Sequence, residues 1–554
     1  MNVHLVLNEK PSRTNQKLKT LSNYVQQYPS GWKKRLELAD LLYKMGRWLE
    51  AVEEYRQVLQ REPCLIAVRL QIGKLLHLLG KDKEAIAVYQ ETLSLCHNAA
   101  TKKHLEGLIE LYHHRPHEAV NLLESAASIE PYNQAHWHAI GQVYQETESP
   151  LAALQAFDSA LSLNPNDVVA LNQSYQPLLA VGTFKEARQR LEQALKLSPN
   201  DCRTLQKLAT HRCQQGLVTG EEGKQTKQLI NTALTLAPDW ASAHQILSLY
   251  HLCRGKWDKA VAVLLKFTEE HPHSPLGWYH YAQCLFYTGN SYTAAEAILR
   301  AYNLYQNDCE IYLALCEILP AAGRLEEFGI NSHSDSEPPK SPLLRKTLTE
   351  NSPLDKGLKR SPRGVRREQK YQLASKTNTT SGSLIEEMLN RFPQNWNVWV
   401  TTGRVLVETF KNIEEGCRVS AHAVQLQPQL PEAWFLYGRV LAIAGRHREA
   451  TEVLAQGWQL QSQGYLPSVS AALWLGESYQ ALGDEPRSRK WWQEACDRTQ
   501  VLIKFNPTTA YYWQGRALLA LGDVKGAREA YSMAIARHLL YPARGEVKQT
   551  LLNL

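Results

Sequence analysis

The segment from Gln134 to Asp167 reads QAHWHAIGQVYQETESPLAALQAFDSALSLNPND. Its large apolar residues recur every three or four positions in two blocks, which predicts two consecutive amphipathic helices. Small residues stand where those helices must approach each other, namely Gly141 in the first helix and Ala153 and Ala160 in the second. Pro165 ends the second helix, because proline lacks an N–H and its ring clashes with the preceding turn.

This two-helix unit repeats along the chain. Pro131, Pro165 and Pro199 are spaced 34 residues apart, and the same residue types return between them. A fixed period of this length is typical of stacked helical repeats. The pattern resembles the tetratricopeptide repeat, whose units carry Trp, Leu, Gly, Tyr, Ala, Phe, Ala and Pro at these offsets. In the 134–167 unit the matching residues are Trp137, Ile140, Gly141, Tyr144, Ala153, Phe157, Ala160 and Pro165.

The resemblance implies an all-α fold, namely a tetratricopeptide-type α-solenoid, which is a right-handed superhelix of helix-turn-helix repeats. We expect two such arrays, separated by a linker. We expect an N-terminal tail and capping helix in residues 1–31 and about nine repeats in residues 32–330. About four more repeats follow in residues 383–542, and a capping helix closes the chain in residues 543–554.

Residues 331–382 break the pattern. The segment has no helical periodicity, is rich in Ser and Pro, and holds 11 Lys or Arg against 5 Asp or Glu, whereas the whole chain has a net charge of +7. Such a composition predicts a disordered basic linker. Because clustered Lys and Arg attract phosphates, residues 356–370 suggest an alternative function as a regulator that contacts nucleic acid or an anionic surface. Tyr371 is the only aromatic residue available there to stack on bases, which argues against this alternative.

The composition favours a folded protein with no membrane span. Hydrophobic residues make up 44% of the chain, and no stretch is long and apolar enough for a transmembrane helix. The first ten residues lack the features of a secretory signal, so we expect a cytoplasmic protein. The ten cysteines are dispersed and form no CxxC pair, which favours a role as small buried hydrophobic residues.

The sequence contains none of the common catalytic motifs. A P-loop, a GxGxxG fingerprint, HExxH and GxSxG are all missing. We therefore expect a non-catalytic protein without a cofactor or a metal site. Its function would be to bind partner proteins or peptide segments in the concave grooves of the two arrays, as a scaffold or an assembly factor.

The resemblance also implies which residues face the groove, because the first helix of each repeat lines the concave side of such arrays. In the N-terminal array these positions are neutral and rich in amides, which suits the backbone of an extended peptide. The candidate partner-binding residues there are His138, Gln142, Asn172, Gln176, Gln206, Tyr279 and Gln283. A solvated face without a ligand is the alternative for any one of them. The Lys and Asn pattern of arrays that bind chaperone tails is not matched.

In the C-terminal array the same positions hold aromatic and Arg side chains, which are enriched at binding hot spots. The candidate residues are Phe435, Arg439, Trp474, Trp513 and Arg516. We expect Trp474 and Trp513, at equivalent places in separate repeats, to form one apolar surface. A slip of one residue in the register would instead place some of these side chains in the core.

Overall fold

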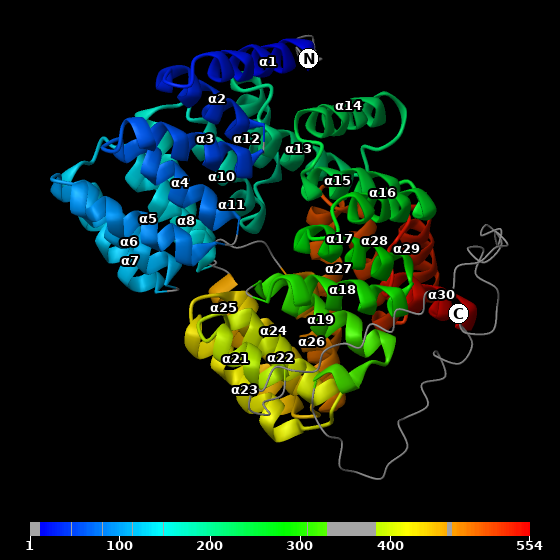
Figure 1. Cartoon of the computed structure of the whole chain (residues 1–554). Helices are drawn as coiled ribbons and strands as arrows, with labels where there is room; N and C mark the ends of the chain where they lie inside the picture. The colour runs from blue at the N-terminus through cyan, green and yellow to red at the C-terminus, as the bar shows by residue number, and fades with distance from the viewer. Residues whose placement is uncertain are drawn as a thin grey trace. The chain divides into compact units, whose positions relative to one another are not determined.

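The fold was obtained as a computed structural model, and it is all-α. It describes residues 11–328, apart from positions 46, 80, 114, 148 and 307, and residues 384–554, apart from 462–467. No strand occurs in these ranges. Helices follow one another in pairs, and Figure 1 shows consecutive pairs stacked side by side along the chain. The expected fold class, a tetratricopeptide-type solenoid, is confirmed.

Each repeat contributes a first and a second helix. The first helices are α2 (Trp32–Lys44), α4 (Ile66–Leu78), α6 (Ala99–Tyr112), α8 (Gln134–Glu146), the pair α10 (Val168–Gln173) and α11 (Tyr175–Ala180), α13 (Cys202–Gln214), α15 (Ala241–Leu252), α17 (Pro275–Thr288), α19 (Cys309–Ala322), α22 (Trp396–Glu408), α24 (Pro431–Ile443), α26 (Val469–Ala481) and α28 (Pro507–Leu521).

The second helices follow in the same order. They are α3 (Trp48–Arg61), α5 (Asp82–Leu95), α7 (Pro116–Ile129), α9 (Pro150–Leu163), α12 (Phe184–Leu197), α14 (Gly220–Leu236), α16 (Trp257–Glu270), α18 (Ser291–Leu304), α23 (Ile413–Leu426), α25 (His447–Gln461), α27 (Glu485–Ile503) and α29 (Val524–Ala536). The remaining elements are α1 (Pro11–Gln27), the 3-10 turn η1 (Leu325–Phe328), α21 (Leu384–Arg391) and α30 (Ala543–Asn553).

In several repeats the two helices meet at a glycine. In the 134–167 unit, a Cβ atom on Gly141 would lie 2.3 Å from the Phe157 ring, so only glycine permits this approach of α8 to α9. Phe157 is fully buried at that contact. α9 ends at Leu163, two residues before Pro165, as the sequence predicts.

A second contact fixes the connection that precedes each first helix. Trp137 donates its indole N–H to the carbonyl oxygen of Pro131 at 3.0 Å. The same bond, from the fourth position of a repeat to the proline six residues earlier, is made by Trp278, Trp399 and Trp434. Arg69 and His244 occupy the fourth position of two other repeats and bond the carbonyl groups of Pro63 and Pro238 instead. These two repeats therefore make the same hydrogen bond to a proline carbonyl although they have no tryptophan at the fourth position.

The first helices form the inner layer of the stack. α13, α15, α17 and α19 each contact the next first helix, as do α22, α24 and α26, and these contacts are more extensive than those between successive second helices. Because elements on the inside of a curved stack approach each other more closely, the first helices line the inner face and the second helices the outer face.

Residues 1–324 and 388–554 belong to one compact unit, and residues 325–387 to a second one, of which the structure describes η1 and the start of α21. Within the first unit α19 packs against α22. The Tyr312 hydroxyl and the Thr402 hydroxyl are hydrogen-bonded at 2.9 Å, and both side chains are buried. The repeats on either side of the expected linker are therefore neighbours. The linker itself, residues 331–382, lies outside the described residues.

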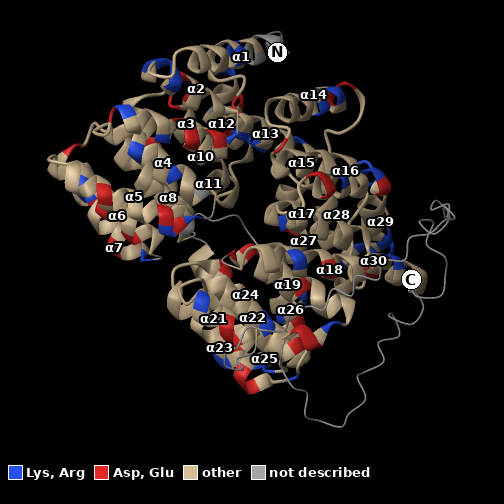
Figure 2. Cartoon of the chain, in the orientation of Figure 1, with Lys and Arg blue, Asp and Glu red and all other residues tan. Residues whose placement is uncertain are grey.

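The distribution of charged residues, cysteines and apolar helices in the structure can be compared with what the composition predicts. Lys and Arg are interspersed with Asp and Glu over the helices (Figure 2). The ten cysteines are free, and most are buried, although Cys64 is exposed. Within the part of the chain that the structure covers, no helix has both the length and the apolar character needed to cross a bilayer.

Candidate protein-interaction groove

The inner face near α8, α10 and α13 is a row of hydrogen bonds between repeats. His138 on α8 contacts Asp167, the residue directly before the first helix of the next repeat, with 2.6 Å between Nε2 and Oδ2. Asp167 also caps α10 by accepting hydrogen bonds from the backbone N–H groups of Val169 and Ala170. Burial raises the pKa of Asp167, whereas the hydrogen bond from His138 lowers it. The net effect is a lowered pKa. His138 thus connects two repeats.

Asn172 is one of the expected partner-binding residues, and the structure corrects its orientation. Its side chain is 6% exposed, and its amide donates to and accepts from the Thr204 hydroxyl at 2.7 and 3.0 Å. Lys207 donates to the Asn172 backbone carbonyl at 2.7 Å. A side-chain amide that is buried and bonded to its neighbour is not on the surface that a ligand would contact. Of the neighbouring candidates, Gln176 is exposed, and Gln142 and Gln206 are partly buried.

Tyr279 and Gln283 lie on α17 and line a small pocket of about 120 Å³. The Gln283 side-chain amide donates to the Tyr279 hydroxyl at 2.7 Å. The opposite wall comes from α19, where Glu310, Leu313 and Glu317 follow one face of the helix. Phe286, Tyr287, Ala314 and Ile318 complete the lining.

The electrostatic character of this pocket differs from the expected neutral face. Burial raises the pKa of Glu310, and the neighbouring carboxylate of Asp308 raises it further. Burial also raises the pKa of Glu317, although the Arg404 charge opposes this effect. Neither carboxylate forms an ion pair with a residue that the structure describes. The pocket between α17 and α19 is therefore lined by two carboxylates, and the Arg404 charge acts on one of them, Glu317.

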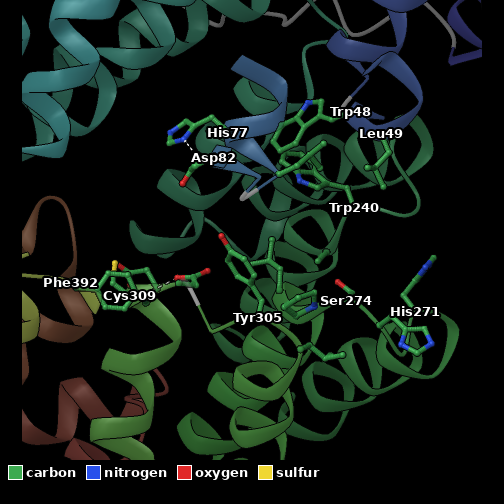
Figure 3. Close-up of a pocket in the computed structure, with 18 of the residues that line it drawn as sticks. Trp48, Leu49, His77, Asp82, Trp240, His271, Ser274, Tyr305, Cys309 and Phe392 are labelled. Carbon is green, nitrogen blue, oxygen red and sulfur yellow. Dashed lines mark hydrogen bonds and ion pairs between the residues drawn. The ribbon is translucent and has the colours of Figure 1, made fainter. Parts of the chain in front are cut away.

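A larger pocket of about 1320 Å³ adjoins the small one, and Glu310 lines both. Figure 3 shows Trp48, at the start of α3, beside Trp240, which precedes α15; their ring centroids are 6.0 Å apart. His77 and Asp82 form an ion pair on the wall of this pocket, with 2.7 Å between Nδ1 and Oδ1 (Figure 3). Tyr305 and Phe267 add further aromatic surface.

In the C-terminal repeats, Glu477 on α26 lies between two arginines. Arg439 on α24 contacts one carboxylate oxygen at 3.0 Å, and Arg516 on α28 contacts the other at 2.7 Å. Each arginine also lies over a tryptophan ring, Arg439 over Trp474 and Arg516 over Trp513, at 5.5 and 5.4 Å from the ring centroid. All three charged side chains are partly exposed on the inner face.

The expected apolar surface of Trp474 and Trp513 is not formed. Trp474 is 9% exposed and Phe435 is 1% exposed, and both pack in one core cluster with Leu454 and Leu475. Trp513 is half-buried and packs between two other clusters. The physical reason is that the second helices α25 and α27 carry Trp458 and Trp491, which pack against this cluster. Phe435 and Trp474 are thus core residues rather than surface residues.

Glu310 and Glu317 were missed at the sequence level, although a signal for them existed. They occupy the second and ninth positions of the repeat that begins at Cys309. Those are positions that the resemblance assigns to the concave face. The expected binding residues of the N-terminal array end one repeat earlier, at the neutral pair Tyr279 and Gln283.

Comparison with known proteins identifies the family from the sequence. Two family models, both described as tetratricopeptide repeat, match residues 36–100, 247–308 and 499–538 in one case and residues 137–167 in the other. A search of curated proteins gives no match.

Among solved structures, yeast Tom70 is 14% identical over 95% of each chain, with a TM-score of 0.38. A tetratricopeptide repeat protein of Thermus thermophilus is 19% identical and has a TM-score of 0.30. The match covers 34% of this chain and all of that one. The pilF protein of Pseudomonas aeruginosa is 20% identical and also has a TM-score of 0.30. That match covers 40% of this chain and 97% of the other.

The assignment rests on the matched sequence segments and on the repeat contacts described above, from the glycine approach of Gly141 to the proline bond of Trp137. The chain is therefore a protein that contains tetratricopeptide repeats, in the segments that the family models match.

Proposed function

We propose that this chain is a non-catalytic scaffold or assembly factor that binds segments of partner proteins along the inner face of its first helices. Tetratricopeptide repeats typically mediate protein–protein interactions, and their fold is generally non-catalytic. The observation that carries the proposal is the pocket of about 1320 Å³ with aromatic walls, joined to the pocket between α17 and α19. Concave sites with apolar walls and a few polar groups are where proteins bind ligands and peptide segments.

Site-specific photo-crosslinking tests this function with a matched pair of tyrosines. Tyr279 lines the small pocket on the inner face, whereas Tyr292 lies on the second helix α18 and is 63% exposed. Each is replaced in turn by a photoreactive phenylalanine analogue in the full chain, which is then irradiated in source cells. We expect protein adducts from position 279 that position 292 does not give. Equal adducts from both positions, or none from 279, would contradict the proposal.

No observation favours the alternative of a nucleic-acid- or surface-associated regulator. Its candidate contact, residues 356–370, lies outside the described residues. The cytoplasmic location expected from the sequence stays a prediction.

A further inference from the structure

Repeats that lie far apart in the sequence contact each other through two different edges. The turns that join the first helix of a repeat to its second helix form one edge, which we call the intra-repeat edge. The turns that join one repeat to the next form the other, the inter-repeat edge. Trp48, the first residue of α3, lies on the intra-repeat edge and contacts Trp240, which directly precedes α15 on the inter-repeat edge. An earlier repeat thus presents one kind of edge to the other kind on a later repeat.

The same pairing of edges recurs elsewhere in the chain. Phe184, the first residue of α12, stacks on Phe505, which precedes α28, with ring centroids 4.2 Å apart. Trp257, the first residue of α16, contacts His538 in the turn between α29 and α30, with ring centroids 6.1 Å apart. Arg544 lies over the same Trp257 ring. In each contact the intra-repeat edge belongs to the earlier repeat and the inter-repeat edge to the later one.

The large pocket has the same arrangement. Trp48 and Asp82, the first residues of α3 and α5, line it from the intra-repeat edge. Trp240, Ser274 and Tyr305 line it from the inter-repeat edge (Figure 3). Because every such contact joins two unlike edges, one edge remains unmatched at each end of the stack. These are the inter-repeat edge of the first repeats and the intra-repeat edge of the last repeats.

The unmatched inter-repeat edge exposes apolar side chains. Tyr132 is 85% exposed and directly precedes Asn133, the N-cap residue of α8. Phe505 has the equivalent place before Asn506, the N-cap residue of α28, and it is only 9% exposed where it stacks on Phe184. Tyr132 therefore occupies a contact position whose partner this chain does not supply among its described residues. Further exposed residues on this edge are Tyr28, Leu95 and Ile129.

The unmatched intra-repeat edge is apolar at the corresponding positions. Val524 is the first residue of α29, as Phe184 is of α12, and it is 45% exposed. Ile413, the first residue of α23, is exposed as well. Leu482, at the C-cap of α26, lies on the same edge and is also exposed. Both halves of the contact that joins distant repeats are thus present at opposite ends of the stack.

We propose that a second copy of this chain covers these edges and that the copies associate head to tail. The inter-repeat edge of one copy's first repeats packs on the intra-repeat edge of the other copy's last repeats. Continuity selects this occupant, since the contact repeats one that the chain already makes with itself. Because the two edges differ, the contact is heterologous, and each added copy leaves one edge of each kind free. The assembly is therefore open, and its size depends on concentration.

Sedimentation velocity of the full chain over a series of micromolar concentrations tests the proposal. We expect the average mass to rise with concentration beyond that of a dimer. Tyr132→Arg and Val524→Arg each place a charge on one edge and should weaken self-association at least tenfold. Leu265→Arg, at an exposed apolar residue in the middle of α16, is the control and should change nothing. A chain that stays monomeric at every concentration, or an equal effect of all three substitutions, would overturn the proposal.

Mixing the two edge variants distinguishes a head-to-tail contact from a symmetric one. Tyr132→Arg leaves the intra-repeat edge intact, and Val524→Arg leaves the inter-repeat edge intact. We expect each variant alone to be monomeric and an equimolar mixture to form dimers but no larger species, because both outer edges of the mixed dimer carry Arg. A mixture that stays monomeric, or a variant that still associates with itself like the unmodified chain, would overturn the proposal. Thermal melting confirms that the variants remain folded.

Discussion

At the scale of the residue, Gly141 sets the distance between the two helices of its repeat. Gly141→Ala adds a Cβ atom 2.3 Å from the buried Phe157 ring, so α8 and α9 must separate. We expect a loss of about 1–3 kcal/mol in the free energy of unfolding, as for other overpacked cores. Urea denaturation followed by circular dichroism measures it. Adding Phe157→Leu should recover part of the loss, since the smaller side chain leaves room.

The control for this prediction is Gly445, a position where the backbone conformation, and not a neighbouring side chain, favours glycine. It follows α24 with φ of +78°, and no atom lies within 4 Å of a Cβ built there. Gly445→Ala should therefore cost about 1 kcal/mol through the left-handed backbone alone. Trimming a neighbouring side chain would not recover that loss. If Phe157→Leu failed to improve Gly141→Ala, the steric explanation would be wrong.

A pair of buried histidines makes the same region sensitive to acid. His104 and His136 are 6% and 2% exposed, and their Nδ1 atoms are 3.0 Å apart, so one ring donates and the other accepts. Burial, together with the charges of the nearby His136 and His138, lowers the pKa of His104 to about 3. Below about pH 6.5, His104 binds a proton in the unfolded chain but stays neutral in the folded chain. Stability is therefore lost as the pH falls from about 6.5 towards 3.

The variant His104→Gln removes this titrating group and can still hydrogen-bond His136. We expect the drop in unfolding free energy between pH 7 and pH 5 to shrink by about 1–2 kcal/mol, since one proton is worth about 1.4 kcal/mol per pH unit. Urea midpoints at the two pH values measure the change. His117→Gln, at an exposed histidine on α7 of the same repeat as His104, is the control. An unchanged pH dependence in His104→Gln would refute the assignment.

The residue scale also shows how far the sequence alone could predict contacts. The tryptophans of the repeat pattern were placed correctly, because Trp137 and Trp434 match the family signature. Arg69 and His244 make the same bond to proline, yet a signature of residue types does not reveal them, since the site needs a donor rather than an indole. Glu310 was missed for a different reason. Its place in the repeat that begins at Cys309 was a sequence signal, but the expected binding residues ended one repeat earlier.

At the scale of the element, the first helix of the 168–201 repeat is broken into α10 and α11 by Pro177. Proline cannot donate to the carbonyl of Gln173, four residues earlier. The Gln145 side chain of the preceding repeat donates to that carbonyl instead, at 2.8 Å. The chain thus replaces a lost backbone bond with one between repeats. The periodicity predicts one helix here, and the sequence does not indicate which side chain would satisfy the freed carbonyl.

A double-mutant cycle tests this compensation. Gln145→Ala leaves the Gln173 carbonyl unpaired and should cost about 1–2 kcal/mol. In the background of Pro177→Ala, the amide of residue 177 can bond that carbonyl, so the same change should cost at most a few tenths of a kcal/mol. Urea denaturation of the four proteins gives the coupling energy. Gln155→Ala, at an exposed site on α9, should show no coupling to Pro177→Ala. Additive costs for Gln145→Ala would exclude the compensation.

At the scale of the whole molecule, the two arrays recognised from the sequence form one compact unit. Periodicity could not predict the contact between the repeats on either side of residues 331–382, because Tyr312 and Thr402 lie in separate repeats with no shared sequence signal. The C-terminal end makes further contacts of this kind. Arg544 lies over the Trp257 ring at 4.6 Å from its centroid and donates to the Thr288 carbonyl at 3.2 Å. Covalent continuity through residues 331–382 should therefore not be needed to hold the arrays together.

Cutting the chain between its arrays tests that conclusion. A protease site placed within residues 331–382 allows one cut in the folded protein, and we expect the two fragments to elute together in size-exclusion chromatography at micromolar concentration. Tyr312→Phe removes the buried hydroxyl partner of Thr402, and Arg544→Ala removes the contact with Trp257. Each should weaken the association of the fragments by about 1–2 kcal/mol, or five- to thirtyfold in Kd. Lys548→Gln, in the exposed part of α30, should not. Fragments that separate without any substitution would show that the arrays are held together by the intervening chain alone.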